Sequence, residues 1–160
     1  MVEKEQYHNK DISSTSIREK ISKGDMAEVN EMLDHPYSVI GRVEHGKQLG
    51  RTINFPTANI IPEAVKLLPP NGVYRTKVVI NGEKFDSITN VGVNPTVESG
   101  KKIKVETNIL DYEGDVYGEI IQVLFFDFIR PERTFSNMEE LKQQIQRDTE
   151  KCRTLAGRKN

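Results

Sequence analysis

The chain has 160 residues, a length typical of one domain with at most a small appendage. Its 23 Lys and Arg against 24 Asp and Glu leave a net charge of −1, which disfavours nucleic acid and anionic membranes as partners. The one cysteine excludes an internal disulfide, and no apolar run reaches the roughly 18 residues that span a bilayer, so we expect a cytoplasmic protein.

The first 34 residues show the pattern of two short amphipathic helices. The hydroxyl-bearing run 13–15 is typical of a helix start, and Gly24 is typical of a helix end. A second helix is expected from Asp25, with apolar residues three or four apart up to Leu33. Because two short helices cannot form a stable core of their own, we expect them to pack on the rest of the chain or to be partly disordered.

From Tyr37 onward the apolar pattern changes to that of β-strands. Asn81-Gly82 lies between two such runs and is the strongest short signal for a hairpin. The run Phe135-Ser136-Asn137 is expected to cap a final amphipathic helix. The expected strands are 37–43, 73–80, 85–91, 102–110 and 118–129.

Strands joined by hairpin-length turns, with a long helix only after them, indicate an antiparallel barrel rather than a parallel α/β sheet. The expected fold is therefore mainly β: a small closed six-stranded antiparallel barrel with a C-terminal helix and short N-terminal helices. We expect residues 1–34 to form a helical segment and residues 35–160 to form the barrel domain with its helix.

The segment that most suggests chemistry is 50–59, Gly-Arg-Thr-Ile-Asn-Phe-Pro-Thr-Ala-Asn, which follows a glycine-bearing run. In an extended strand, Thr57 and Asn59 would point to the same side. Mg²⁺ shared with nucleotide phosphates takes only one or two protein oxygens, so a hydroxyl and a carboxamide at this spacing suit such a metal. On spacing alone, a turn leading into a strand is the commoner explanation.

Glu106 is the candidate general base. It lies mid-strand on the face opposite Val105 and Thr107, where a carboxylate at the barrel mouth could take a proton from a substrate hydroxyl. The alternative is a solvated carboxylate beside Lys104. The three histidines have no metal-ligand spacing, so a zinc site is not expected.

The chain resembles the riboflavin kinase family, in particular the kinase module at the C-terminal end of bacterial bifunctional riboflavin kinase/FAD synthetases. The resemblance runs from about Tyr37 to Thr154. The motifs that carry it are Gly41-Arg-Val-x-x-Gly46, Gly50-Arg51, Phe55-Pro-Thr-Ala-Asn59, Asn71-Gly-Val-Tyr74, Thr89-Asn-Val-Gly-Val-Asn-Pro-Thr96, Val105-Glu106-Thr107, Val116-Tyr-Gly-Glu119, Ile129-Arg-Pro-Glu132 and Phe135.

The resemblance implies ATP-dependent, Mg²⁺-dependent phosphoryl transfer to the 5′-hydroxyl of riboflavin, giving FMN and ADP. By motif position, Thr57 and Asn59 would contact the metal and the phosphates, and Glu106 would act on the hydroxyl. Further positions implied in the same way are Gly46 and Arg51 in the phosphate loop, Ile109, Asp111 and Tyr117 at the adenine nucleotide, and Arg130, Arg133 and Phe135 at the border of the flavin.

The sequence departs from the family at two positions. Asn54 stands where a glycine is usual, and Asn108 stands where a histidine is frequent, which leaves the role of the Asn108 side chain open. A non-catalytic flavin-binding regulatory barrel remains the alternative, although a flavin store needs no metal clamp.

Residues 11–33 resemble the end of the FMN adenylyltransferase module that precedes the kinase in the bifunctional proteins. In that module a Ser-Ser-Thr-x-x-Arg motif helps to bind ATP, and the matching residues here are Ser13, Ser14, Thr15 and Arg18. The nucleotide-binding sheet of that module is absent from this sequence. We therefore interpret the four residues as vestigial or as the edge of a truncated module, and we do not expect FAD synthesis from this chain alone.

Overall fold

The structure, a computed structural model, describes residues 6–7, 10–11, 14–44, 57–62, 67–96 and 100–158. Its helices are α1 Ser14–Lys23, α2 Met26–Leu33 and α4 Met138–Arg158. Its strands are β1 Gln6–Tyr7, β2 Lys10–Asp11, β3 Tyr37–Glu44, β4 Thr57–Pro62, β5 Gly72–Ile80, β6 Glu83–Thr96, β7 Gly100–Ile109 and β8 Ile120–Arg130.

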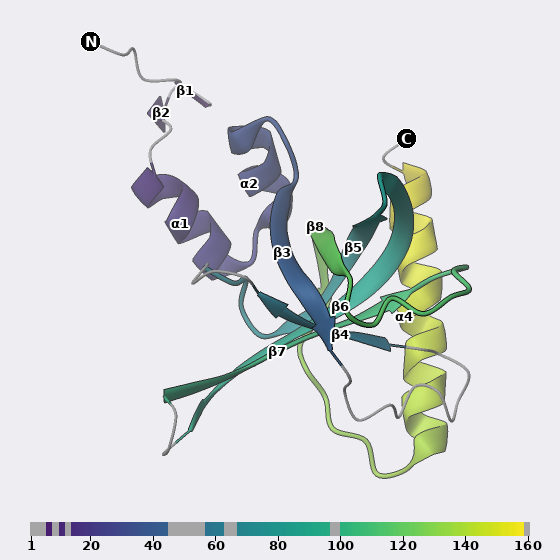
Figure 1. Ribbon diagram of the computed structural model, residues 1–160. Coiled ribbons are helices and arrows are strands. Elements are labelled where there is room, and N and C mark those ends of the chain that lie inside the picture. Colours follow the sequence, from purple (N-terminus) through teal and green to yellow (C-terminus); the bar gives the residue numbers. More distant parts are fainter. Residues whose placement is uncertain are drawn as a thin grey trace.

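Six of the described strands close into an antiparallel barrel in the order β3-β4-β7-β6-β5-β8, which confirms the expected fold (Figure 1). The β5–β6 hairpin turns at Asn81 and Gly82, whose φ angles of 51° and 82° are those of the turn predicted for Asn-Gly. β4 is the one barrel strand that was not among the five ranges expected from the sequence, and it begins at Thr57. The segment that suggested chemistry therefore ends in the barrel wall.

The barrel interior is filled by alternate residues of every strand. Val105 is fully buried on β7, as are Val39 on β3 and Val123 on β8. A chain of hydroxyl groups crosses the interior from β5 to β7, with oxygen–oxygen distances of 2.7 to 2.8 Å. Its members are Ser87, Thr76, Thr89 and Thr107. These buried polar side chains therefore satisfy one another's hydrogen bonds inside the barrel.

Helices α1 and α2 pack on one end of the barrel, as Figure 1 shows. Asn30 on α2 donates to the backbone carbonyl of Phe125 and accepts from the backbone N–H of Tyr37, both at 2.7 Å. Met26 and Val29 are buried in the same cluster as the barrel interior. Of the two alternatives left by the sequence, packing on the barrel is the one that the structure shows.

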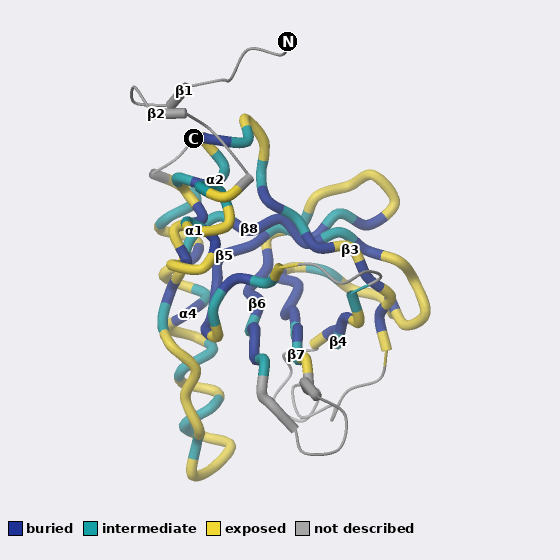
Figure 2. Tube along the Cα trace, turned by 90° about the vertical axis from the view of Figure 1, so that its left-hand side faces the viewer, coloured by how far each residue is buried: buried dark blue, intermediate teal, exposed yellow. Residues whose placement is uncertain are grey.

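Helix α4 lies along the outside of the barrel wall (Figures 1 and 2). Asn137 caps it, with its side-chain oxygen accepting from the backbone N–H of Glu140 at 2.9 Å, as predicted. A second apolar cluster joins the C-terminal half of the helix to the wall. Its buried members are Val73, Ile88, Leu110, Ile129 and Cys152.

Candidate active site

A pocket of about 280 Å³ lies between the outer face of the barrel wall and the N-terminal half of α4. The wall contributes five polar side chains: Thr57, Asn90, Lys104, Glu106 and Asn108. The segment between β8 and α4 contributes Arg130, Arg133 and Phe135. The helix contributes Leu141, Ile145 and Asp148. Five of the residues predicted from the sequence therefore line one pocket.

The strand register places the polar residues in a row. On β7, Glu106 lies opposite Asn59 of β4 and opposite Asn90 of β6. The row continues from Asn90 to Val73 on β5, and from Val73 to Arg130 on β8. Since directly opposed residues of antiparallel strands share a face, all five side chains are on the outer face of the barrel.

Glu106 is on the outer face of this wall and not inside the barrel, which corrects the expectation of a carboxylate inside the barrel mouth. Val105 and Thr107 on either side of it are fully buried in the interior. A period of two then forces Glu106 outward, toward α4. Its carboxylate is 3.7 Å from the ammonium group of Lys104, and both side chains are partly exposed.

Thr57 and Asn59 are two residues apart on β4 and so share the face of Glu106. Thr57 is exposed and is the register partner of Asn108, whereas Asn59 is half-buried. Their oxygens are hard, neutral donors beside a carboxylate, a donor set that fits a divalent cation shared with phosphates. Within the described residues, no group of three or more His, Cys, Asp or Glu side chains is arranged to hold a metal ion.

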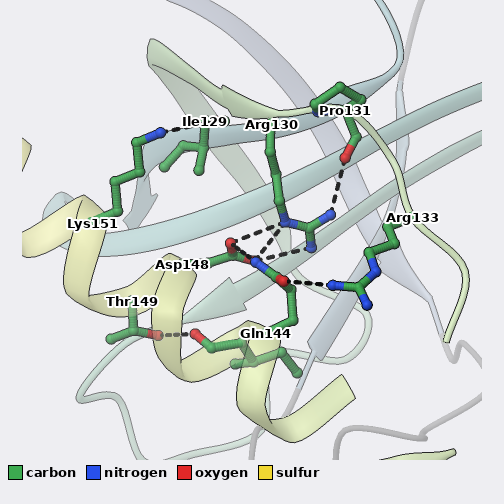
Figure 3. Close-up of polar contacts among 9 residues, drawn as sticks. Ile129, Arg130, Pro131, Arg133, Gln144, Asp148, Thr149 and Lys151 are labelled. Atoms are coloured by element: carbon green, nitrogen blue, oxygen red, sulfur yellow. Dashed lines mark hydrogen bonds and ion pairs between the residues drawn. The ribbon is translucent and has the colours of Figure 1, made fainter. Parts of the chain in front are cut away.

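Arg130 is fixed to α4 by a bidentate ion pair, as Figure 3 shows. Its guanidinium nitrogens lie 3.0 to 3.1 Å from the two carboxylate oxygens of Asp148, whose residue is only 4% exposed. The β5–β8 pairing shifts register twice, and the shift between Val73 and Tyr74 sets Arg130 opposite Val73, facing the helix. The bulge thereby aims the side chain at the pocket.

Phe135 lies under two guanidinium groups. The central guanidinium carbon of Arg133 is 5.2 Å from the ring centre, and that of Arg130 is 5.9 Å away. Gln144 of α4 accepts from Arg133 at 3.1 Å and donates to Asp148 at 3.0 Å (Figure 3). This end of the pocket is therefore an aromatic and cationic wall with a defined geometry, suited to a flat ring system.

The residues predicted to meet the adenine nucleotide do not line this pocket. Ile109 is buried in the barrel interior, and Asp111 is exposed and paired with Arg153 of α4 at 3.0 Å. Tyr117 is 53% exposed in the loop before β8. Gly46 and Arg51 lie outside the described residues, as does Asn54.

The Tyr117 loop is nonetheless joined to the site through β3. The backbone N–H of Gly118 donates to Val43, and the next residue of β3, Glu44, is the register partner of Asn59. Asn59 is therefore connected to this loop through its register partner on β3.

Sequence reasoning missed Asn90 and the helix residues of the pocket, and it left Asn108 open. Asn108 and Lys104 follow from the period of two around Glu106. Asn90 requires the β6–β7 register, which the sequence does not show. Asp148 has the appearance of an ordinary surface carboxylate on an amphipathic helix.

A family model described as Flavokinase: Riboflavin kinase matches residues 33–156. The chain belongs to the riboflavin kinase family. This confirms the family and the class of enzyme expected from the sequence motifs. Riboflavin kinases act on riboflavin and ATP and use a divalent metal.

The curated relatives of this riboflavin kinase family member are called bifunctional riboflavin kinase/FMN adenylyltransferase. The protein from Listeria monocytogenes is 38% identical over 155 residues, which cover 97% of this chain and 49% of the relative. That from Escherichia coli strain K12 is 42% identical over 147 residues, covering 91% and 46%. The chain thus spans about half the length of the curated relatives it matches.

Two solved structures are similar to this member of the riboflavin kinase family. A crystal structure of a Streptococcus pneumoniae protein called a macrolide-efflux protein has a TM-score of 0.89 and 36% identity, covering 95% of this chain and 50% of that one. A riboflavin kinase from Trypanosoma brucei has a TM-score of 0.54 and 25% identity, covering 75% and 79%. Within the described residues of this chain, we find no helix with the length and apolar character to cross a membrane.

Proposed function

We propose that this chain transfers the γ-phosphoryl group of ATP to the 5′-hydroxyl of riboflavin, giving FMN and ADP, with Mg²⁺ as the divalent metal. The observation that carries the proposal is the placement of Thr57, Asn59 and Glu106 on one outward face of two adjacent strands. These three side chains come from motifs about 50 residues apart in the sequence, and the register puts Asn59 directly opposite Glu106.

In the proposed reaction Glu106 accepts the proton of the 5′-hydroxyl as the oxygen bonds to the γ-phosphorus. The bond between that phosphorus and the bridging oxygen breaks, and ADP leaves. Phosphoryl transfer proceeds through a loose transition state, so positioning and charge neutralisation dominate the catalysis. Mg²⁺, when bound with the nucleotide, supplies the neutralising charge, and Thr57 and Asn59 are the residues proposed to hold it.

The other proposed contacts form two groups, one for the flavin ring and one for the nucleotide. The flavin ring is proposed to lie against Phe135 and Arg133, with Arg130 beside them. The nucleotide is proposed to extend past β4 and β3 toward Tyr117, with Gly46 and Arg51 in the connection between those strands. Ile109 and Asp111 complete the nucleotide set predicted from the motifs; Ile109 acts there through packing, since its side chain is buried.

We propose further that residues 35–160 form the kinase unit and that residues 1–34 are the end of an adenylyltransferase module. The start of the family match at residue 33 supports this boundary. The proposed location is the cytoplasm, where the single cysteine of the chain remains reduced.

The test is an assay of FMN formation from riboflavin and Mg-ATP, with the wild type beside Glu106→Gln. General-base help is typically worth about 10² to 10⁴-fold, so the Gln variant should bind riboflavin normally and lose about that factor in kcat. Glu83→Gln, on the exposed end of the β5–β6 hairpin, is the matched control and should keep the wild-type rate.

No FMN from the folded wild type would end the enzyme proposal and leave the flavin-binding barrel in its place. A Gln variant that turns over at the wild-type rate would remove Glu106 as the base while leaving the activity itself standing.

A further inference from the structure

Asn90 has a side-chain oxygen that is buried and has no hydrogen-bond partner among the described residues, the only such atom found there. Its neighbours on β6, Thr89 and Val91, are fully buried in the barrel interior. The alternation of the strand therefore turns Asn90 outward, into the pocket that it lines. Leaving a buried oxygen unpaired costs free energy, so such an atom requires an explanation.

A structural role does not explain this residue. Asparagine is disfavoured in strands, and the buried polar side chains of the interior do pair with one another. Either end of a primary amide is a hydrogen-bonding group, so the buried end of this side chain calls for a partner.

The position of Asn90 in the row indicates what its amide meets. It lies one strand from Glu106 and two strands from Arg130. With neighbouring strands about 4.8 Å apart, the row from Glu106 to Arg130 extends about 14 Å along the sheet. A molecule with a ring at Phe135 and a reacting hydroxyl at Glu106 must pass its connecting chain over Asn90.

We propose that Asn90 is a specificity-determining residue whose amide hydrogen-bonds a secondary hydroxyl of the substrate's polyol chain. The inference rests on the proposed function, in which the ring and the reacting hydroxyl are joined by the ribityl chain. A neutral amide suits this task because it binds a hydroxyl without competing with Glu106 for the proton that is transferred. A site built to bond a hydroxyl rejects a ligand that lacks it, since the buried oxygen then stays unpaired.

The test measures binding by quenching of flavin fluorescence, with riboflavin and with lumiflavin, whose ring carries a methyl group in place of the hydroxylated chain. Asn90→Leu should weaken riboflavin binding roughly fivefold to tenfold, the value of one hydrogen bond, and change lumiflavin binding less than about twofold. Asn90→Ala is the second variant, in case leucine does not fit. Lys84→Ala, on the exposed β5–β6 hairpin, is the control and should change neither ligand.

Thermal unfolding of the ligand-free variants separates the proposed role from a structural one. Loss of an unpaired oxygen should leave the Tm at or above the wild-type value, whereas loss of a structural contact would lower it. Equal weakening of both flavins, or no weakening of either, overturns the role of Asn90. If the selective loss is seen but the wild type makes no FMN, the kinase proposal fails. The role of Asn90 in binding a hydroxyl of the ribityl chain then stands.

Discussion

At the scale of single residues, the centre of the site is a carboxylate between two amides. Glu106 faces Asn59 across one strand boundary and Asn90 across the other, and the ammonium group of Lys104 is 3.7 Å from its carboxylate. An ion pair in which both side chains are about a third or more exposed contributes little to stability. The carboxylate is therefore held by the register of three strands and remains available to a substrate.

Thr57→Val tests the metal assignment, because valine keeps the shape and the strand preference of threonine but removes the hydroxyl oxygen. We expect kcat/KM to fall by about tenfold or more and the Mg²⁺ concentration for half-maximal rate to rise. The measurement is a Mg²⁺ titration of FMN formation at fixed ATP. Thr154→Val, on an exposed part of α4, should follow the wild-type curve. An unchanged Mg²⁺ requirement in Thr57→Val would remove Thr57 from the metal site.

Cys152 is buried against the barrel wall, and burial, with the Asp148 carboxylate second, raises the pKa of its thiol from 9.0 to about 12. At pH 8 the folded thiol should then carry about 1,000-fold less thiolate than the unfolded one. We expect a disulfide reagent to label the native chain far more slowly than the chain in denaturant. Labelling at equal rates would show that the thiol is exposed.

The same shift has a consequence for stability. Since the folded thiol holds its proton more tightly, its contribution is complete below pH 9 and is lost as the pH rises from 9 toward 12. Cys152→Ala should therefore show a smaller loss of stability over this interval than the wild type, as measured by urea unfolding at each pH.

At the scale of elements, α4 forms one side of the pocket, and its attachment to the barrel holds Arg130 in place. The C-terminal half of the helix is held by apolar contacts, and its middle is held by the pair between Arg130 and Asp148. A further hydrogen bond runs from the ammonium group of Lys151 to the carbonyl of Ile129 at 3.1 Å (Figure 3). The helix therefore holds Arg130 through Asp148 and Arg133 through Gln144.

Asp148→Asn should destabilise the protein by about 2 to 4 kcal/mol, because it leaves the guanidinium group of Arg130 poorly compensated in a mostly buried place. Asp111→Asn is the matched control, since it makes the same change in an exposed ion pair to the same helix. It should cost less than about 1 kcal/mol. Both free energies of unfolding are measured by chemical denaturation. Equal losses in the two variants would show that the buried pair stabilises the protein no more than the exposed pair.

At the scale of the whole molecule, the barrel has a filled interior. The hydroxyl chain and an apolar core occupy it. Helices α1 and α2 share that core and cover one end. The site forms where β4 and β7 meet outside the barrel, near the start of α4.

Ligands that bind this folded site should raise the Tm. At about 100 times Kd, one ligand adds about 2.7 kcal/mol, which corresponds to roughly 5 to 10 °C in a chain of this size. We expect riboflavin and Mg-ADP each to raise the Tm of both the wild type and Glu106→Gln, as measured by thermal unfolding monitored by circular dichroism. A nucleotide that has no effect on Tm while riboflavin has one would favour the flavin-binding barrel over the kinase.

The sequence by itself determined the class of fold, the hairpin at Asn81-Gly82 and the caps of α2 and α4. These features depend on contacts between residues close in the chain, which local propensity and period can report. It also placed Thr57 and Asn59 on one face, because a period of two relates residues on a single strand.

Tertiary structure alone decided that Glu106 faces outward and that Asn90 flanks it. Strand register is set by pairings between distant segments, and a shift of one residue would exchange the two faces of the wall. The same holds for Asp148, whose partner Arg130 is aimed by a bulge in β8. The pocket lies between the outward row of the barrel wall and α4, elements that are distant in the sequence and meet only in the folded chain.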